Sequence, residues 1–219
     1  MASNMTAEGV QKSSRKQHTQ SAAARERLEQ IIEAAVRLIN LRGSSGMSLQ
    51  MVADEVGITQ AGVLHYVKSK HGLLVEVIKH YYDRSSSADD YLALFEPGGV
   101  FEGQQPKIPE FCRLIAAENS NQPEMVRLFQ TLNTEAMSPD SPLHDYFADR
   151  SRNVSNPERK RSWSAPEGVN ADDAYSCAMA ALYGLEGRWL ARPDEIDYLE
   201  EWARFEDVLF PLPLWEGYR

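Results

Sequence analysis

The sequence has little cysteine, no long apolar run and no excess of positive charge. Its two cysteines, Cys112 and Cys177, lie far apart in a chain of 219 residues. This spacing is typical of a reducing compartment and excludes a disulfide framework or a zinc-ligand cluster. No apolar stretch approaches the roughly 20 residues that cross a bilayer, and the first twenty residues contain no hydrophobic segment of a secretory signal. We therefore expect a cytoplasmic protein with no membrane partner.

Motifs that commonly carry catalysis or cofactor binding are also absent. The sequence contains no Gly-rich phosphate loop, no nucleophile elbow and no His-Glu or Cys-Cys ligand spacing. His71 and His80 lie nine residues apart, a spacing that does not let one helix face chelate a metal with both. We expect no catalytic residue, no metal site and no cofactor. The alternative from another class is a helical-pocket enzyme or carrier acting on a small hydrophobic molecule, with His144 as a candidate residue.

Charge is divided unevenly along the chain. The formal net charge is −9, but residues 1–84 sum to +3 and residues 85–219 to −12. A change of sign between segments favours different partners for the two parts, and it makes the first part the better candidate for binding a polyanion. Chance variation in solvated charges is the alternative explanation. Sequence motifs must therefore decide whether the first part binds a polyanion.

The apolar pattern is helical throughout, and no β-alternation of any length appears. Residues 1–24 are polar and are expected to form a flexible arm. Apolar residues then recur every three or four positions from Leu28 to Ile39, which predicts a helix from Arg25 to a stop at Gly43. Ser48 and Thr59 are predicted N-caps of two short helices joined through Gly57. This order is typical of a helix-turn-helix, and a longer helix follows Lys70.

These residues resemble a known family of regulators. The stretches RERLEQIIEAAVRLINLRG and MSLQMVADEVGITQAGVLHYVKSKHGLL are similar to the DNA-binding domain of TetR-family transcriptional regulators. The resemblance implies an all-α fold, with a three-helix helix-turn-helix domain at residues 25–70 and a helical effector-binding and dimerisation domain at 71–219. The chain has Leu64 where many members have tyrosine, so Tyr66 is expected to replace its phosphate contact.

The outward side chains of this motif suit double-stranded DNA. Gln60 can form the two-point amide contact to adenine, and Thr59 can reach a phosphate or a thymine methyl group. A glycine at position 62 either lets the helix approach DNA closely or permits tight packing between helices. Hydrogen-bond donors at helix starts and on the exposed face can contact phosphates. The predicted DNA-binding set is Ser48, Thr59, Gln60, Gly62, His65, Tyr66 and Lys70.

Further helices are predicted at residues 109–117, 124–137 and 143–154, before a Pro-, Ser- and charge-rich linker at 155–170 and two final helices. The ending LYGLEGRWLARPDEIDYLEEWARFEDVLF is similar to the end of TetR-family chains, which implies a homodimer through these two helices. The predicted dimer residues are Ala174, Ala178, Ala181, Leu185, Trp189, Trp202, Phe205 and Leu209. Two such helices can also pair only with each other.

The resemblance implies a repressor that leaves a palindromic operator when a small-molecule effector of unknown identity binds the helical body. Candidate lining residues are Phe111, Met125, Phe129 and Trp163, for which an ordinary core position is the alternative. A regulator controlled by another protein, without any ligand, is a third possibility.

Overall fold

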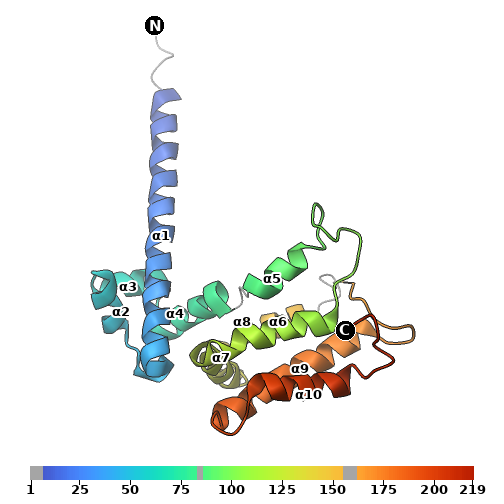
Figure 1. Cartoon of the computed structure of the whole chain (residues 1–219). Coiled ribbons are helices and arrows are strands. Elements are labelled where there is room, and N and C mark those ends of the chain that lie inside the picture. The colour runs from blue at the N-terminus through green and yellow to red at the C-terminus, as the bar shows by residue number, and fades with distance from the viewer. Residues whose placement is uncertain (1–6, 83–85, 155–161) are drawn as a thin grey trace. The chain divides into compact units, whose positions relative to one another are not determined.

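The computed structural model describes residues 7–82, 86–154 and 162–219, and the chain divides into two compact units between Val77 and Ile78. Every regular element in these ranges is a helix (Figure 1), so the predicted all-α class is confirmed. Within the same ranges, the only β pairing is an isolated bridge between Lys107 and Ser164. The predicted linker at 155–170 falls partly outside the described residues. No helix in the described ranges is both long enough and apolar enough to cross a membrane.

The first unit contains α1 (Ala7–Gly46), α2 (Leu49–Val56), α3 (Gln60–Val67) and α4 (Lys70–Val77). One apolar face of α1 packs against α2 and α4, and α3 packs against α2 and α4. Burying these apolar faces holds the short helices in place, because helices of about two turns are marginal on their own. The fully buried core side chains are Ile31, Ala34, Ala35, Ile39, Val52, Ala53, Val63, Leu73 and Val77.

The long helix α1 differs from prediction at its start and agrees at its end. Residues 7–24, predicted as part of a flexible arm, are helical, whereas residues 1–6 lie outside the described ranges. No glycine or proline occurs between Gly9 and Gly43, so nothing in the sequence breaks the helix there. At Gly43 the backbone leaves helical geometry with φ 68°. The predicted stop at this glycine is therefore confirmed as a kink.

The turn between α3 and α4 is closed by a second glycine. The hydroxyl of Ser69 accepts a hydrogen bond from the Gly72 N–H at 2.9 Å, which caps α4. A Cβ atom added to Gly72 would lie 2.0 Å from the carbonyl oxygen of Val67. This close approach of two backbone segments is the reason that the position requires glycine.

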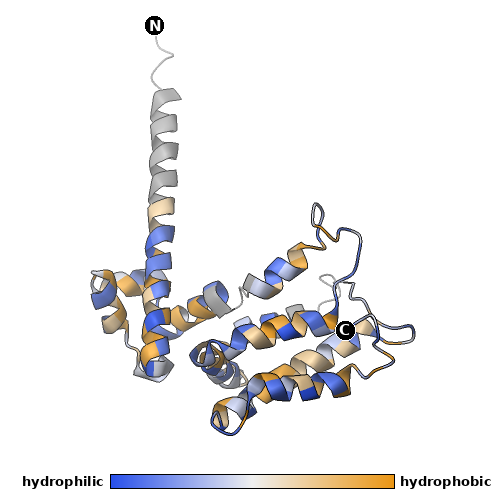
Figure 2. Cartoon of the chain, viewed as in Figure 1, coloured by the Kyte–Doolittle hydropathy of each residue, from blue (hydrophilic) through white to orange (hydrophobic). Residues whose placement is uncertain are grey.

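The second unit begins with a π-helical turn, η1 (Ile78–Tyr82), which continues α4. It then contains α5 (Ser86–Ala93), α6 (Ile108–Ser120), α7 (Pro123–Glu135), α8 (His144–Val154), α9 (Ala171–Ala191) and α10 (Tyr198–Leu209). Helices α6, α9 and α10 pack against one another, α7 packs on α6 and α9, and α5 packs on α6. In Figure 2, α10 alternates strongly hydrophobic with strongly hydrophilic residues, as expected of a helix with one buried face.

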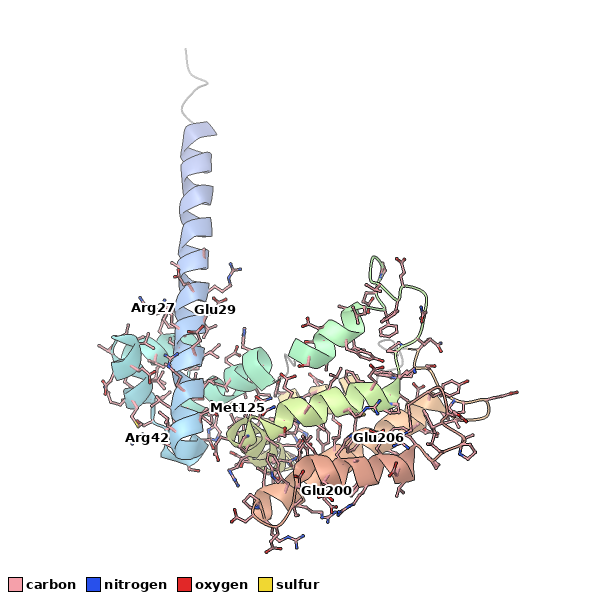
Figure 3. All side chains as sticks on the ribbon, in the orientation of Figure 1. Arg27, Glu29, Arg42, Met125, Glu200 and Glu206 are labelled. Carbon is pink, nitrogen blue, oxygen red and sulfur yellow. The ribbon has the colours of Figure 1, made fainter. Side chains whose placement is uncertain are left out.

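Charged residues tie the chain's last segment to α10. The buried carboxylate of Glu206 on α10 (Figure 3) accepts hydrogen bonds from Arg113 of α6 at 3.2 Å and from Arg219 at 3.1 Å. Arg219 also bonds to Asp207 at 2.6 Å. Near them, the rings of Phe210 and Trp215 are both buried and meet edge to face with centroids 4.7 Å apart. The segment after α10 is thus packed onto the same core.

We expect Gly72→Ala to destabilise the chain by about 2–3 kcal/mol, because the new methyl group must displace the backbone at Val67. Urea unfolding followed by circular dichroism measures this cost. Gly62→Ala is the matched control, since its Cβ would make only ordinary contacts of 3.4 Å or more and alanine favours the helix by about 1 kcal/mol. Equal midpoints for the two variants would contradict the role assigned to Gly72.

Candidate functional site

Two capped helices, α2 and α3, form the candidate nucleic-acid-binding element. The Ser48 hydroxyl accepts a hydrogen bond from the N–H of Met51 at 3.2 Å, and the Thr59 hydroxyl accepts from the N–H of Gly62 at 3.1 Å. Gly57 ends α2 with φ 72°, and the N–H of the next residue, Ile58, donates to the Ala53 carbonyl at 3.0 Å. Both predicted N-caps and the predicted glycine turn are therefore confirmed.

The outer face of α3 lies opposite the side chains that the helix buries in the core. Val63 and Val67 are buried, and the opposite side of the helix carries the exposed residues Ala61 and His65. Gln60, at the first position of α3, is also exposed, whereas Tyr66 is half-buried and its ring meets that of His65 edge to face at 5.4 Å. Ala61 was missed from the sequence, although its spacing of four residues from His65 could have indicated it.

Packing inside the chain does not require the glycine at position 62. A Cβ atom there would lie 3.4 Å from the Thr59 hydroxyl oxygen and 3.5 Å from an Ile58 methyl carbon, both ordinary contacts. Because glycine inside a helix costs about 1 kcal/mol relative to alanine, the structure gives no internal reason for it. This observation favours close approach by an external partner over tight packing between helices.

Two lysines follow the end of α3, and their ammonium groups donate hydrogen bonds to different carbonyl oxygens. The ammonium group of Lys70 donates to the carbonyl oxygen of Met47 at 2.6 Å and lies 3.5 Å from that of Ser45. It therefore ties the start of α4 to the segment that joins α1 to α2. Lys68, which the sequence reasoning did not select, is exposed, has φ 67° and donates to the carbonyl of His65 at 2.9 Å.

The predicted effector-lining residues lie in the core of the second unit, in two aromatic groups. Phe111 and Trp163 have ring centroids 5.1 Å apart, and Trp163 stacks on Tyr175 at 5.0 Å. Phe129 instead packs against Phe147 at 5.8 Å and Tyr183 at 5.6 Å. Met125 is fully buried (Figure 3). All four side chains are core residues in this structure.

The predicted dimer residues pack within a single chain. Three of them, Ala178, Leu185 and Trp202, belong to the buried core of the second unit. The other five are half-buried and pack against the same core: Ala174, Ala181, Trp189, Phe205 and Leu209. Helices α9 and α10 pack against each other in this unit, and short side chains such as those of the α9 stripe reduce the distance between packed helix axes. The exposed face of α9 consists of different residues.

Known proteins match both units. The family model for bacterial regulatory proteins of the tetR family matches residues 31–77. The match covers the later part of α1 and all of α2, α3 and α4. The HTH-type transcriptional regulator in the dhlA 5′ region of Xanthobacter autotrophicus is 23% identical over 176 residues, covering 79% of this chain and 84% of that protein. The probable HTH-type transcriptional regulator YttP of Bacillus subtilis (strain 168) is 34% identical over 55 residues, covering 25% and 27%.

A solved structure shows the same fold over most of the chain. The multidrug binding protein EbrR in complex with imidazole matches with a TM-score of 0.58 and 19% identity, covering 86% of this chain and 92% of that one. The predicted resemblance to TetR-family regulators and the predicted all-helical fold are thus confirmed.

The helical body contains a buried polar cluster that was missed from the sequence. The carboxylate of Glu186 on α9 is fully buried and accepts from the side-chain amides of Asn119 (2.8 Å) and Gln130 (2.7 Å). The Gln130 amide also donates to the Tyr183 carbonyl at 3.2 Å. A signal was present, since Glu186 follows Leu182 by four residues on the apolar face of α9.

Burial dominates the ionisation of this carboxyl group. Removal from water raises the pKa of Glu186 from 4.5 to about 7, although the amides of Gln130 and Asn119 and the charge of Arg150 oppose the shift. In the folded chain, the group therefore holds its proton over a pH range in which the unfolded chain has lost it. Its contribution to stability is fully present below about pH 4.5 and is lost as the pH rises through about 7.

We expect Glu186→Gln to remove this pH dependence. Relative to the variant, the wild-type chain should lose about 3 kcal/mol of unfolding free energy between pH 4.5 and 8. Chemical denaturation at a series of pH values measures the difference. Glu167→Gln, at an exposed position, is the matched control and should follow the wild-type curve. Parallel curves for Glu186→Gln and wild type would contradict the assignment.

Proposed function

We propose that this protein is a homodimeric TetR-family repressor that binds a palindromic DNA operator in the cytoplasm and leaves it when a small molecule binds the helical body. One observation carries the DNA-binding part: α3 is held by a cap and a buried Val63–Val67 face, so that its N-terminus and opposite face stay exposed. A short helix presented in this way fits the major groove, while its flanking elements contact the backbone.

Base reading is assigned to the start of α3. The exposed Gln60 amide can both donate to and accept from one adenine, and the neighbouring Thr59 can contact a thymine methyl group or a phosphate. Gly62 and Ala61 leave little side-chain bulk between the helix and the groove. His65 then reaches the phosphates or base edges further along the helix.

Backbone contacts are assigned to the flanking helix starts. Ser48 and Thr59 already accept hydrogen bonds as caps, but each hydroxyl keeps its own proton for a phosphate oxygen. Tyr66 supplies a further hydroxyl. Lys70 holds two carbonyl groups of the α1–α2 connection, so its role combines positioning with a positive charge near the phosphates. Lys68 adds a second charge beside it.

Dimerisation is assigned to the exposed face of α9 rather than to the residues predicted from sequence. Cys177, Ala180, Gly184, Gly187 and Ala191 are exposed and recur at helical spacing. A Cβ atom at Gly184 or Gly187 would meet nothing within 4 Å in its own chain. Glycine therefore has no packing role inside the subunit, and it would let a second α9 approach closely.

The neighbouring surface of α10 extends this face. Arg188 of α9 lies 3.9 Å from Glu201 of α10, which places the two helices side by side, and Val208 is 79% exposed. An exposed apolar side chain next to a strip of small residues is typical of a surface that another subunit covers. A twofold axis through this face would pair two copies of α3 for the two half-sites of an operator.

Release by an effector is supported by the likeness of fold. EbrR, which shares this fold, is described as a multidrug binding protein. In the present chain, the aromatic groups around Trp163 and Phe129 would supply the apolar surroundings for such a molecule. Binding would favour a conformation of the body in which the two copies of α3 no longer match the operator spacing.

We expect Gln60→Ala to relax operator sequence preference at one A·T pair in each half-site by about tenfold. The wild-type protein first selects binding sites from a random DNA duplex library. Titration of these sites with each protein, followed by fluorescence anisotropy, then measures the effect. Gln105→Ala, in an exposed loop of the body, is the matched control. Selection of no sequence by the wild type would refute the proposed function, whereas unchanged preference in Gln60→Ala would refute only this contact.

We expect Gly184→Arg to convert a dimer into a monomer, because the long charged side chain would fill the face where two helices approach. Sedimentation velocity at several protein concentrations measures the mass. Ala117→Arg introduces the same side chain at an exposed position of α6 and should leave the dimer intact. A wild-type monomer, or a variant that still dimerises with wild-type affinity, would show that this face is not the interface.

A further inference from the structure

Two hydrogen-bond donors in the core of the helical body have no acceptor. Among the described residues, the hydroxyl group of Tyr198 and the indole N–H of Trp202 are buried and have no hydrogen-bond partner. The two side chains are 3% and 2% exposed. Nearly all buried polar groups in proteins are paired, because an unpaired one forfeits its hydrogen bonds to water. Two such groups on one helix therefore require an explanation.

Both donors lie on the buried face of α10, one helical turn apart. Burial and the charge of Glu186 raise the pKa of Tyr198, so the hydroxyl and that carboxyl group influence each other electrostatically. The side chain of Asn119 lies beside the hydroxyl and lowers its pKa, which is the effect of an amide N–H directed at the phenol oxygen and gives the hydroxyl proton no acceptor. The ring of Tyr198 stacks on Trp189 at 4.8 Å. Tyr198 thus has an aromatic neighbour in Trp189 and polar groups near its hydroxyl, and Trp202 belongs to the same buried core.

This arrangement selects among ligand chemistries. An ammonium group has no lone pair with which to accept from Tyr198 and Trp202. A carboxylate could accept, but a second carboxyl group in this water-excluded core would have to bear the same cost of burial that raises the pKa of Glu186. A hydrocarbon would leave both donors unpaired. A neutral carbonyl or hydroxyl oxygen can accept from either donor, and a hydroxyl can also donate to Glu186.

We propose that Tyr198 and Trp202 are the binding groups for the oxygen atom of a neutral, mostly apolar effector that carries a carbonyl or hydroxyl group. The inference rests on the proposed function, since it names the ligand class of the effector site. Both side chains are closed off from solvent in this structure, so ligand entry must displace neighbours of α10. The same helix lies beside the proposed dimer face on α9, which connects ligand entry to the arrangement of the two subunits.

The first experiment measures binding without DNA. The melting temperature of the full-length chain is followed by circular dichroism with five probes that share one aromatic ring: benzyl alcohol, acetophenone, toluene, benzylammonium and benzoate. Ligands stabilise the folded chain according to their affinity. We expect benzyl alcohol and acetophenone to raise the melting temperature more than the other three at equal free concentration. Equal shifts for toluene, or larger shifts for either charged probe, would overturn the proposal.

The second experiment uses the isosteric variant Tyr198→Phe. Removing an unpaired buried hydroxyl should raise the melting temperature of the ligand-free chain by about 2–4 °C, because no hydrogen bond is lost. The same change should weaken benzyl alcohol binding about tenfold. Tyr183→Phe is the matched control, since its hydroxyl accepts from Arg150 at 3.2 Å. That variant should lower the melting temperature and leave the preference for oxygen-bearing probes intact.

A lowered melting temperature in Tyr198→Phe would show that its hydroxyl has a structural partner, and unchanged probe binding would show that it does not contact the ligand. Either result overturns the proposal. Trp202→Phe gives the independent readout of the second donor, with the same expected loss of preference for benzyl alcohol over toluene. Operator binding distinguishes failure of the ligand site from failure of the proposed function. An operator complex that forms while no probe binds refutes the ligand site alone. Probes that bind without releasing the operator refute only the proposed effector response.

Discussion

Hydrogen bonding to the buried Glu186 carboxylate constrains how the helical body can pack. Each of its oxygens accepts from an amide, one on α6 and one on α7, so three helices must hold one register to satisfy one side chain. A buried carboxyl group without those donors would cost far more than any single apolar contact contributes. The unpaired donors of Tyr198 and Trp202 lie in the core of the same unit. Among the described residues, α10 is therefore the helix that carries the buried donors without an acceptor.

The DNA-binding unit follows a different principle. Its helices are short, and they are fixed by caps, a glycine approach and a small apolar core rather than by a buried polar network. Ser48, Thr59 and Ser69 each close the first turn of a helix, and Lys70 bonds the start of α4 to the segment that joins α1 to α2. In this arrangement the outer face of α3 does not pack against the rest of the unit. We therefore propose that Gly62 and His65 contact a partner.

Much of this unit could be predicted from sequence, because caps, apolar spacing and glycine turns act over a few residues. The body was harder to predict. The stripe from Ala174 to Trp189 indicated a close helix contact, but spacing alone does not say whether the contact is with α10 or with another subunit. In the structure the stripe packs into the core of its own chain, and Gly184 and Gly187 are exposed. The Glu186 cluster joins residues up to 67 positions apart, beyond the reach of local patterns.

The sequence by itself determined the helical class, the resemblance to TetR-family regulators, the break in helical geometry at Gly43 and the caps of α2 and α3, since each depends on side chains within one or two turns of the same chain. Only the tertiary structure decided which face of α9 is buried, what Lys70 contacts and which polar groups share the core. Those features depend on the register between helices distant in sequence, and register is set by the joint packing of all the apolar faces rather than by any one of them.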